Sequence, residues 1–172
     1  MVSLSKSEFN VISFLIRSFS KRFTIRNIAS QLGISAAGAH AVLKKLEKTN
    51  VVKAEKLGTG LFYEINLDDK VARYLAAIVL LRHFDIKIDV SEIEKESKAA
   101  IFDGKKLLVV TSNTDLVKDI CYKKKIEVIC KEEEEFIEAL RYNDEEILSI
   151  LEKGNVLYGE ELVVDSIMKV MK

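Results

Sequence analysis

The sequence has no proline, only two cysteines and no long apolar run. Without proline, none of its 172 residues form a proline-rich linker. Cys121 and Cys130 do not make a disulfide framework or show metal-ligand spacing, which favours plain thiols in a reducing cytoplasm. The longest apolar run, Leu75 to Leu81, is too short to cross a bilayer, and the first ten residues show no signal-peptide pattern. We therefore expect a cytoplasmic protein that has no membrane association.

The residues that are present favour folded domains with an uneven charge. Apolar residues make up 48% of the chain, which is ample for one domain or two small ones and too much for disorder. Residues 1–70 hold 11 Lys and Arg against 6 Asp and Glu, whereas the remaining residues hold 16 against 21. The imbalance indicates that a polyanion would bind the N-terminal part, although an imbalance of this size also arises by chance.

Helix-capping residues punctuate the first fifty positions. Apolar residues recur at helical spacing behind each cap, and Gly33 stands where a helix end needs a positive φ. The predicted helices run from Ser5 or Ser7 to about Phe19, from Thr24 to about Leu32, and from Ser35 to about Asn50.

A hairpin pattern follows the third helix. Two strand-like segments, 51–53 and 61–65, flank the turn Gly58-Thr59-Gly60. Helix, glycine turn, capped helix, strand, glycine tip and strand, in this order, resemble a winged helix-turn-helix over residues 5–67. The resemblance implies a DNA-binding domain, residues 1–67, whose third helix lies in the major groove. The hairpin, or wing, would lie over a minor groove or phosphates.

The third helix offers few side chains that could distinguish bases. His40 is the evident candidate for a base edge, and Ser35 is a possible one. Ala36 and Ala37 could contact thymine methyl groups. Gly38 is either tolerated within the helix or lets the helix backbone approach the groove floor. The alternative for His40 is an exposed histidine without a role.

Cationic and polar side chains around this helix are predicted to contact phosphates. They are Lys44, Lys45 and Lys48 on the third helix, Lys53, Lys56 and Thr59 on the wing, and Arg26 and Asn27 on the second helix. A solvated lysine face is the alternative. The prediction is a binder of double-stranded DNA that depends on phosphate contacts and DNA shape, with modest base readout and a steep salt dependence.

Residues 68–88 are predicted to form a connecting helix that begins at Asp68 and Asp69. Its apolar residues cover most of the circumference, which indicates burial on several sides. We expect one side to meet each domain and a third side to form a homodimer. His83, at the end of this segment, is interpreted as an interface or surface residue without a metal role.

Residues 89–172 alternate between helix and strand. Strands are expected at 99–102, 107–111 and 126–130, and helices at 114–123, 131–140, 143–153 and 160–171. The pattern predicts a small α/β domain with a mixed or antiparallel sheet of three or more strands. The fold class of the whole chain is therefore α+β: a winged helix-turn-helix, a connecting helix and a small α/β domain.

The C-terminal order also resembles the small nucleotidyltransferase domains of archaea and bacteria, which in archaea often follow a winged helix. The resemblance is clearest over residues 126–164, including the ending GNVLYGEE. It implies a Gly-Ser pair after the first strand and an Asp-x-Asp pair on the next, which holds divalent metals. The corresponding stretch, AAIFDGKKLLVVTSN, has neither, and Asp103 is a lone carboxylate in a turn. The domain is therefore predicted to be catalytically inactive, without a metal or cofactor.

Other chemical motifs are missing. The acidic run Glu132–Glu135 is best explained as a solvated helix start, and no P-loop, dinucleotide fingerprint, catalytic triad or metal-binding cysteine cluster occurs. The leading interpretation is an archaeal-type transcriptional regulator whose C-terminal domain dimerises or senses an unknown effector. The alternatives are a divergent nucleotidyltransferase that keeps a nucleotide or metal site, and a scaffold whose winged helix binds a protein.

Overall fold

The computed structural model describes residues 4–81 and 88–171. The chain divides into two compact units, Met1–Val79 and Leu80–Lys172, each with its own core. The connecting segment predicted at 68–88 is therefore split, because its first residues up to Val79 belong to the first unit.

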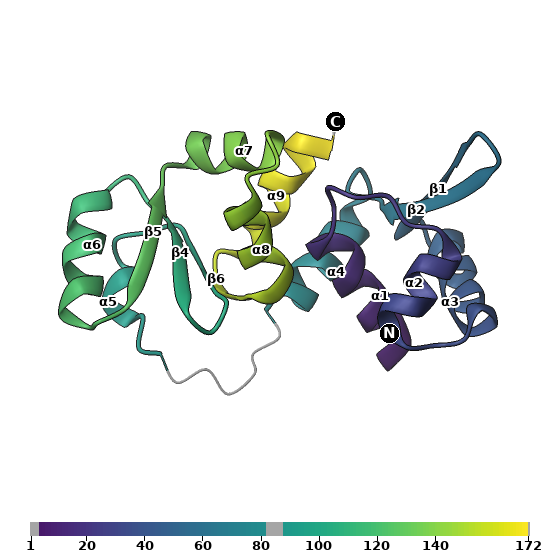
Figure 1. Cartoon of the computed structure of the whole chain (residues 1–172), viewed down its shortest axis with the longest axis horizontal. Coiled ribbons are helices and arrows are strands. Elements are labelled where there is room, and N and C mark those ends of the chain that lie inside the picture. The colour runs from purple at the N-terminus through teal and green to yellow at the C-terminus, as the bar shows by residue number, and fades with distance from the viewer. Residues whose placement is uncertain (1–3, 82–87, 172) are drawn as a thin grey trace. The chain divides into compact units, whose positions relative to one another are not determined.

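In the first unit, three helices and a two-stranded antiparallel hairpin precede the helix of the connecting segment (Figure 1). These elements are α1 (Lys6–Arg17), α2 (Ile25–Leu32), α3 (Ala36–Lys48), β1 (Val52–Leu57) and β2 (Gly60–Ile65). This is the order predicted for a winged helix. Apolar faces of the three helices and of the hairpin form the core, which includes Val11, Ile12, Ile16, Ile28, Leu43, Leu46, Val52 and Ile65.

The predicted caps of these helices are confirmed. The hydroxyls of Ser5, Thr24 and Ser35 accept hydrogen bonds from backbone N–H groups in the first turns of α1, α2 and α3. Gly33 ends α2 with a φ of 64°, the left-handed conformation expected from the sequence. Two helices end earlier than predicted: α1 ends at Arg17 and α3 at Lys48, each two residues before the expected end.

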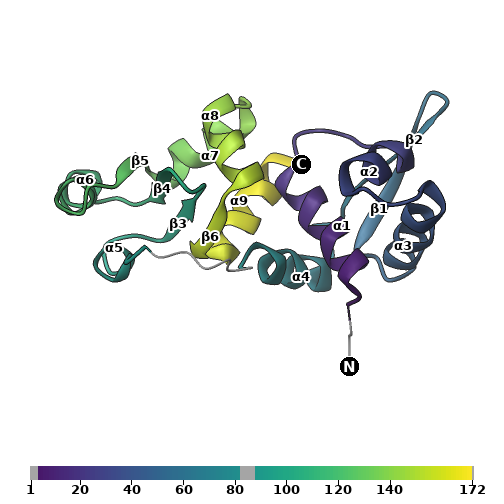
Figure 2. The ribbon, with the colours of Figure 1, turned by 60° about the horizontal axis from the view of Figure 1, so that its bottom comes forward.

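The hairpin is longer than its sequence pattern indicated. Its strands pair from Val52 with Ile65 to Leu57 with Gly60. Phe23, interpreted from the sequence as part of a break, adds a further bridge, because its carbonyl accepts a hydrogen bond from the Tyr63 N–H at 2.8 Å. The base of the hairpin is thereby fixed to the segment before α2, whereas its far end projects past the helices (Figures 1 and 2).

Helix α4 (Lys70–Leu80) begins as predicted from an aspartate. One carboxylate oxygen of Asp69 accepts hydrogen bonds from the N–H groups of Val71 at 2.8 Å and Ala72 at 3.1 Å. Not every apolar residue of this helix is buried: Val71, Tyr74 and Ile78 are 50%, 52% and 56% exposed. The helix ends at Leu80, and residues 82–87 of the predicted helix, including His83, lie outside the described residues.

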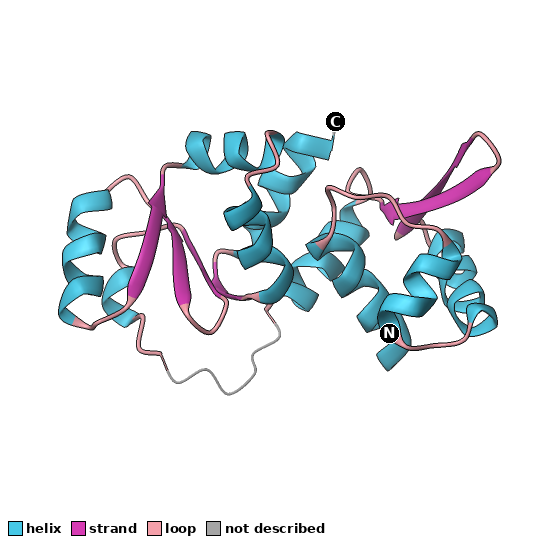
Figure 3. Ribbon diagram, viewed as in Figure 1, coloured by secondary structure: helices cyan, strands magenta, loops and turns pink. Residues whose placement is uncertain are grey.

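The second unit is a mixed four-stranded sheet between two groups of helices (Figures 1 and 3). The strand order is β5-β4-β3-β6, with β4 parallel to β5 and the other two pairs antiparallel. Its elements are α5 (Ser91–Glu94), β3 (Ala99–Phe102), β4 (Lys106–Val110), α6 (Thr114–Lys123), β5 (Glu127–Lys131), α7 (Glu133–Arg141), α8 (Glu145–Lys153), β6 (Asn155–Tyr158) and α9 (Glu160–Met171). The sequence left a mixed and an antiparallel sheet of three or more strands open, and the structure has the mixed one, with four strands.

Two cores lie on opposite faces of this sheet. Ala100, Leu107 and Val109 pack with Ile93 of α5 and with Val117 and Cys121 of α6. Buried residues of α7, α8 and α9, among them Phe136, Ile147 and Val163, belong to the other side of the sheet (Figure 3). Because β-strand side chains alternate between faces, every buried strand serves both cores.

Several boundaries in this unit differ from the prediction by one or two residues. Asp144, not Asn143, caps α8, because its carboxylate accepts from the N–H groups of Glu146 and Ile147. Strand β5 extends through Lys131, so α7 begins at Glu133 and Glu132 is its cap.

No helix within residues 4–81 and 88–171 is long and apolar enough to cross a membrane.

Candidate nucleic-acid interface

Helix α3 presents an outer stripe with two different halves. Ala37, Ala41, Lys44 and Lys48 share one helix face by their spacing, and all four are exposed. The face opposite them carries the buried Ala39, Leu43 and Leu46, so the unit presents this stripe outward. The first half of the stripe is hydrocarbon and nearly flat, and the second half is cationic.

Four cations of the predicted interface are free of protein partners. Arg26, Lys44, Lys48 and Lys56 are exposed and form no ion pair or hydrogen bond through their side chains with any described residue. They come from α2, α3 and β1. Because their charges are not neutralised within the unit, all four are available to an anionic ligand.

Lys45 differs from these four. Its ammonium group lies 2.7 Å from Oε1 of Glu8, whose side chain is only 4% exposed. The other oxygen of Glu8 accepts a hydrogen bond from the Ser5 N–H at 2.7 Å. If the Lys45 side chain turned to a phosphate, the buried carboxylate of Glu8 would lose its cationic partner. That loss costs more free energy than breaking an exposed ion pair. Lys45, predicted as a phosphate contact, is therefore engaged inside the unit.

Lys53 is also paired, but weakly held. Its ammonium group lies 3.0 Å from Glu64 and 3.8 Å from Asp68, and its side chain is 44% exposed. Exposed pairs of this kind contribute about 0–1 kcal/mol. Lys53 can therefore exchange its partners for a phosphate at little cost.

The predicted residues Asn27, Ser35 and Gly38 have structural roles. The Asn27 side-chain oxygen accepts a hydrogen bond from the Thr24 N–H at 3.0 Å, and the Ser35 hydroxyl accepts one from the Gly38 N–H at 3.0 Å. A Cβ at position 38 would lie 3.1 Å from the Ser35 hydroxyl oxygen. The glycine thus makes room for the cap of α3, a reason that differs from the expected approach to a groove floor.

His40 and Thr59 lie at the margins of the site. His40 is exposed and shares its side of α3 with Ala36 and with the acidic Glu47. Thr59 is exposed at the turn between β1 and β2. Neither side chain has a hydrogen-bond partner in the described parts of the chain.

Sequence reasoning missed Glu8. The signal was present, because Ser5 and Glu8 have the spacing of a capping box, and both of its hydrogen bonds are formed. Burial tends to raise the pKa of Glu8, but hydrogen bonds from Lys45 and Ser5 outweigh burial and lower this pKa. The partner on α3 could not be identified from spacing, since it lies 37 positions further along the chain.

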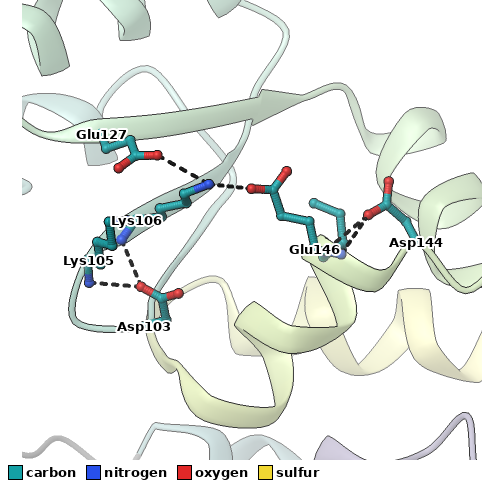
Figure 4. A network of polar contacts seen from close by, with 7 residues as sticks. Asp103, Lys105, Lys106, Glu127, Asp144 and Glu146 are labelled. Carbon is teal, nitrogen blue, oxygen red and sulfur yellow. Dashed lines mark hydrogen bonds and ion pairs between the residues drawn. The ribbon is translucent and has the colours of Figure 1, made fainter.

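The second unit has a polar network at the start of β4 and β5 (Figure 4). The Asp103 carboxylate accepts hydrogen bonds from the N–H groups of Lys105 at 2.8 Å and Lys106 at 2.7 Å. The Lys106 ammonium group contacts the carboxylates of both Glu127 and Glu146. The carboxylates drawn in Figure 4 thus stabilise a turn (Asp103), cap α8 (Asp144) or pair with Lys106 (Glu127 and Glu146).

Neither cysteine is in a disulfide. Cys121 is buried and Cys130 is half-buried. Burial raises the pKa of Cys121 to about 11 and also raises the pKa of Cys130. A thiol with a raised pKa is a poor nucleophile and metal ligand at neutral pH, as expected for structural thiols.

Comparison with known proteins gives little similarity. No family model matches the chain, and no curated protein matches it. Among solved structures, the chain is similar in part to the E41A mutant of ZitR from Lactococcus lactis, with 22% sequence identity and a TM-score of 0.35. The match covers 41% of this chain and 47% of the ZitR chain, so the chain spans about half the length of that protein. A similarity of this size does not establish a shared fold or function.

Proposed function

We propose that the first unit is a winged helix-turn-helix that binds double-stranded DNA, and that the protein is a cytoplasmic transcriptional regulator. The observation that carries the proposal is the exposed stripe of α3, in which two alanines precede Lys44 and Lys48. Small side chains let a helix approach base edges closely, while free lysines on the same face reach phosphates.

The distribution of free charge supports binding through the sugar-phosphate backbone. Arg26, Lys44, Lys48 and Lys56 have no internal partner among the described residues, and Lys53 is held only by an exposed pair. Base discrimination rests on His40 and on contacts of Ala36, Ala37 and Ala41 with thymine methyl groups. The protein would therefore bind with modest sequence preference and a strong dependence on salt.

Fluorescence anisotropy on a random-sequence duplex at several KCl concentrations tests this proposal. Removing two phosphate contacts with Lys44→Ala/Lys48→Ala lowers the slope of log affinity against log salt by about 1.8. The matched control, Lys118→Ala/Lys123→Ala on α6 of the second unit, leaves the slope unchanged. Equal slopes for the two double variants, or no binding by the unmodified protein at low salt, would refute DNA binding through α3 and favour a protein-binding scaffold.

We also propose that the protein forms a homodimer through α4. Val71, Tyr74 and Ile78 follow one face of this helix and are about half exposed, whereas Leu75, Val79 and Leu80 are buried. A two-fold partner would place a second copy of α3 on a second half-site, which compensates for weak base readout by each copy.

For the second unit we propose an inactive relative of the small nucleotidyltransferase domains, with a role in dimerisation or in sensing an unidentified effector. The Asp103 carboxylate is occupied by two backbone N–H groups of its own turn, and the loop between β3 and β4 spans only residues 103–105. Such a loop leaves little room for a triphosphate. Calorimetry with Mg-ATP tests this assignment: measurable binding would favour the alternative, a divergent nucleotidyltransferase.

A further inference from the structure

The far end of the hairpin combines exposed hydrocarbon with a narrow turn. Leu57 and Leu61 are 39% and 44% exposed, although both lie in regular β-structure. Between them, Gly58 and Thr59 make a two-residue turn in which Gly58 has a φ of 59°. The hairpin projects beyond the helices in the two views of Figures 1 and 2, so its end is remote from the core of the first unit.

Hydrocarbon lies on both faces of this wing tip, which we define as residues 56–62. Lys56 and Leu61 are cross-strand partners and therefore share one face, while Leu57 and Phe62 lie on the other. A Cβ at Gly60 would lie 2.6 Å from the Phe62 ring, so the ring covers this glycine. The two leucines thus flank a turn that carries no large side chain.

The charges of the hairpin favour a polyanionic ligand. Glu55 is neutralised by Arg22 at 2.9 Å and Glu64 by Lys53 at 3.0 Å. Lys56 has no partner among residues 4–81 and 88–171. The only uncompensated charge on the described hairpin is therefore positive, and it belongs to the cross-strand neighbour of Leu61. As long as Lys53 keeps its pair with Glu64, both carboxylates of the hairpin are paired with a cation.

The dimensions are suited to a minor groove. The groove is about 6 Å wide, so only a slender element can enter it. The end of the hairpin is its narrowest part, because only Gly58 and Thr59 join the two strands there, and this end is the part that would enter the groove first. Apolar side chains inserted from a minor groove unstack a base step. The free energy gained by burying two leucines is comparable with the free energy needed for that unstacking.

We propose that Leu57 and Leu61 form an apolar wedge that enters the minor groove of duplex DNA and bends it, with Lys56 on an adjacent phosphate. This inference rests on the proposed function and adds a mechanism of shape recognition to it. It also explains how a helix with few base-reading side chains would gain sequence preference, because bending is easiest at flexible pyrimidine–purine steps.

Ligase-catalysed cyclisation of a random-sequence duplex of about 120 bp measures the bending, because this length is below the persistence length of about 150 bp. The full chain is added at concentrations at which anisotropy shows that the duplex is saturated, so binding and bending are measured separately. We expect the unmodified protein to accelerate cyclisation, and Leu57→Ser/Leu61→Ser to reduce the rate at saturation by about tenfold. Leu57→Met/Leu61→Met, which keeps the hydrocarbon, retains the acceleration.

Tyr122→Ser/Tyr142→Ser is the matched control, because it removes two exposed side chains, 86% and 78% accessible, from the second unit. This control leaves cyclisation unchanged. Saturation by the unmodified protein without faster cyclisation overturns the wedge and leaves the proposed function intact, as does an unchanged rate with the serine variant. A lack of binding by every variant at low salt overturns DNA binding itself and the wedge with it.

Discussion

The buried carboxylate of Glu8 binds Lys45 at 2.7 Å and thereby joins the start of α1 to the last turn of α3. Lys44, the adjacent residue, is exposed and has no partner among the described residues. Two neighbouring lysines of one helix consequently have different roles: Lys45 supports the orientation of α3, and Lys44 is available to a ligand. The following experiments separate these roles.

Lys45→Ala is expected to lower stability without changing DNA binding, and Lys44→Ala is expected to weaken DNA binding without changing stability. Lys45→Ala lowers the free energy of unfolding by about 1–2 kcal/mol because the Glu8 carboxylate loses its cationic partner. The salt slope of DNA binding stays unchanged. Lys44→Ala lowers that slope by about 0.9 and leaves stability nearly unchanged. Urea unfolding and anisotropy measure the two quantities, and a reduced salt slope for Lys45→Ala would show that Lys45 reaches phosphate.

Glu8 should also make stability depend on pH. Its folded-state pKa is lowered below the ordinary 4.5, because hydrogen bonds from Lys45 and Ser5 outweigh burial, which alone would raise it. The stabilisation is therefore fully present above about pH 4.5 and is lost as the pH falls through the lowered pKa. Other carboxylates with lowered pKa values, such as Asp103 and Glu133, titrate in the same range.

The difference in unfolding free energy between the unmodified protein and Glu8→Gln isolates the contribution of Glu8. We expect this difference to be constant from about pH 5 to pH 7 and to shrink towards about pH 3. Urea unfolding at each pH provides the measurement. If the difference does not change with pH, the ionised form of Glu8 is not favoured in the folded protein, and its pair with Lys45 does not stabilise the fold.

Local signals in the sequence predicted most elements, and long-range pairing explains what they missed. Capping residues such as Thr24 and Ser35 act within a few positions, so they located the starts of α2 and α3 correctly. The bridge between Phe23 and Tyr63 joins segments far apart in the chain, and Phe23 alone has no strand pattern. The boundary between β5 and α7 was misplaced because Lys131 pairs with Val110, a tertiary interaction that local propensity does not contain.

The sequence predicted which charged residues belong to the candidate interface, but not which of them are paired with carboxylates of the protein. Six lysines and arginines were assigned to phosphates because they are charged and predicted to face outward. Ion pairs in the structure then separate Lys45 and Lys53 from Arg26, Lys44, Lys48 and Lys56. The exposed leucines of the wing were also not singled out, since a strand pattern does not reveal how far a hairpin extends beyond its core.

Asp103 offers a test that separates a turn residue from a metal ligand. Asp103→Ala is expected to lower the free energy of unfolding by about 1 kcal/mol, because two backbone N–H groups lose their acceptor. Asp103→Asn keeps an acceptor oxygen and should cost less. Urea unfolding measures both, and calorimetry with Mg-ATP should show no heat of binding for any of the three proteins. Magnesium-dependent ATP binding that Asp103→Asn abolishes would support the nucleotidyltransferase alternative.

The buried hydroxyl of Ser166 in α9 is expected to lower the stability of the second unit. Its hydroxyl is buried and has no hydrogen-bond partner in the described residues. Ser166→Ala removes an unsatisfied polar group and improves helix propensity, so we expect a gain of about 0.5–1 kcal/mol in unfolding free energy. Ser149→Ala in the half-exposed part of α8 controls for propensity alone. A smaller gain at position 166 than at position 149 would indicate that the Ser166 hydroxyl has a partner.

Tyr74 tests whether α4 mediates dimerisation. The tyrosine lies between Val71 and Ile78 on the exposed face of the helix, and the Lys70 ammonium group lies 5.8 Å from the centre of its ring. In a two-fold antiparallel arrangement, Tyr74 would meet its symmetry mate and Val71 would meet Ile78 of the other copy. Tyr74→Glu places two carboxylates at that centre, so we expect the dimer to weaken by at least about tenfold.

Sedimentation equilibrium at micromolar concentration measures the effect, with Tyr122→Glu on the second unit as the control. Because each copy brings its own α3 to the duplex, loss of the dimer should also lower the affinity for long DNA more than for a duplex that accommodates a single copy. A monomeric unmodified protein would exclude the α4 dimer, and equal losses of affinity on long and short duplexes would show that Tyr74→Glu acts on folding and not on assembly.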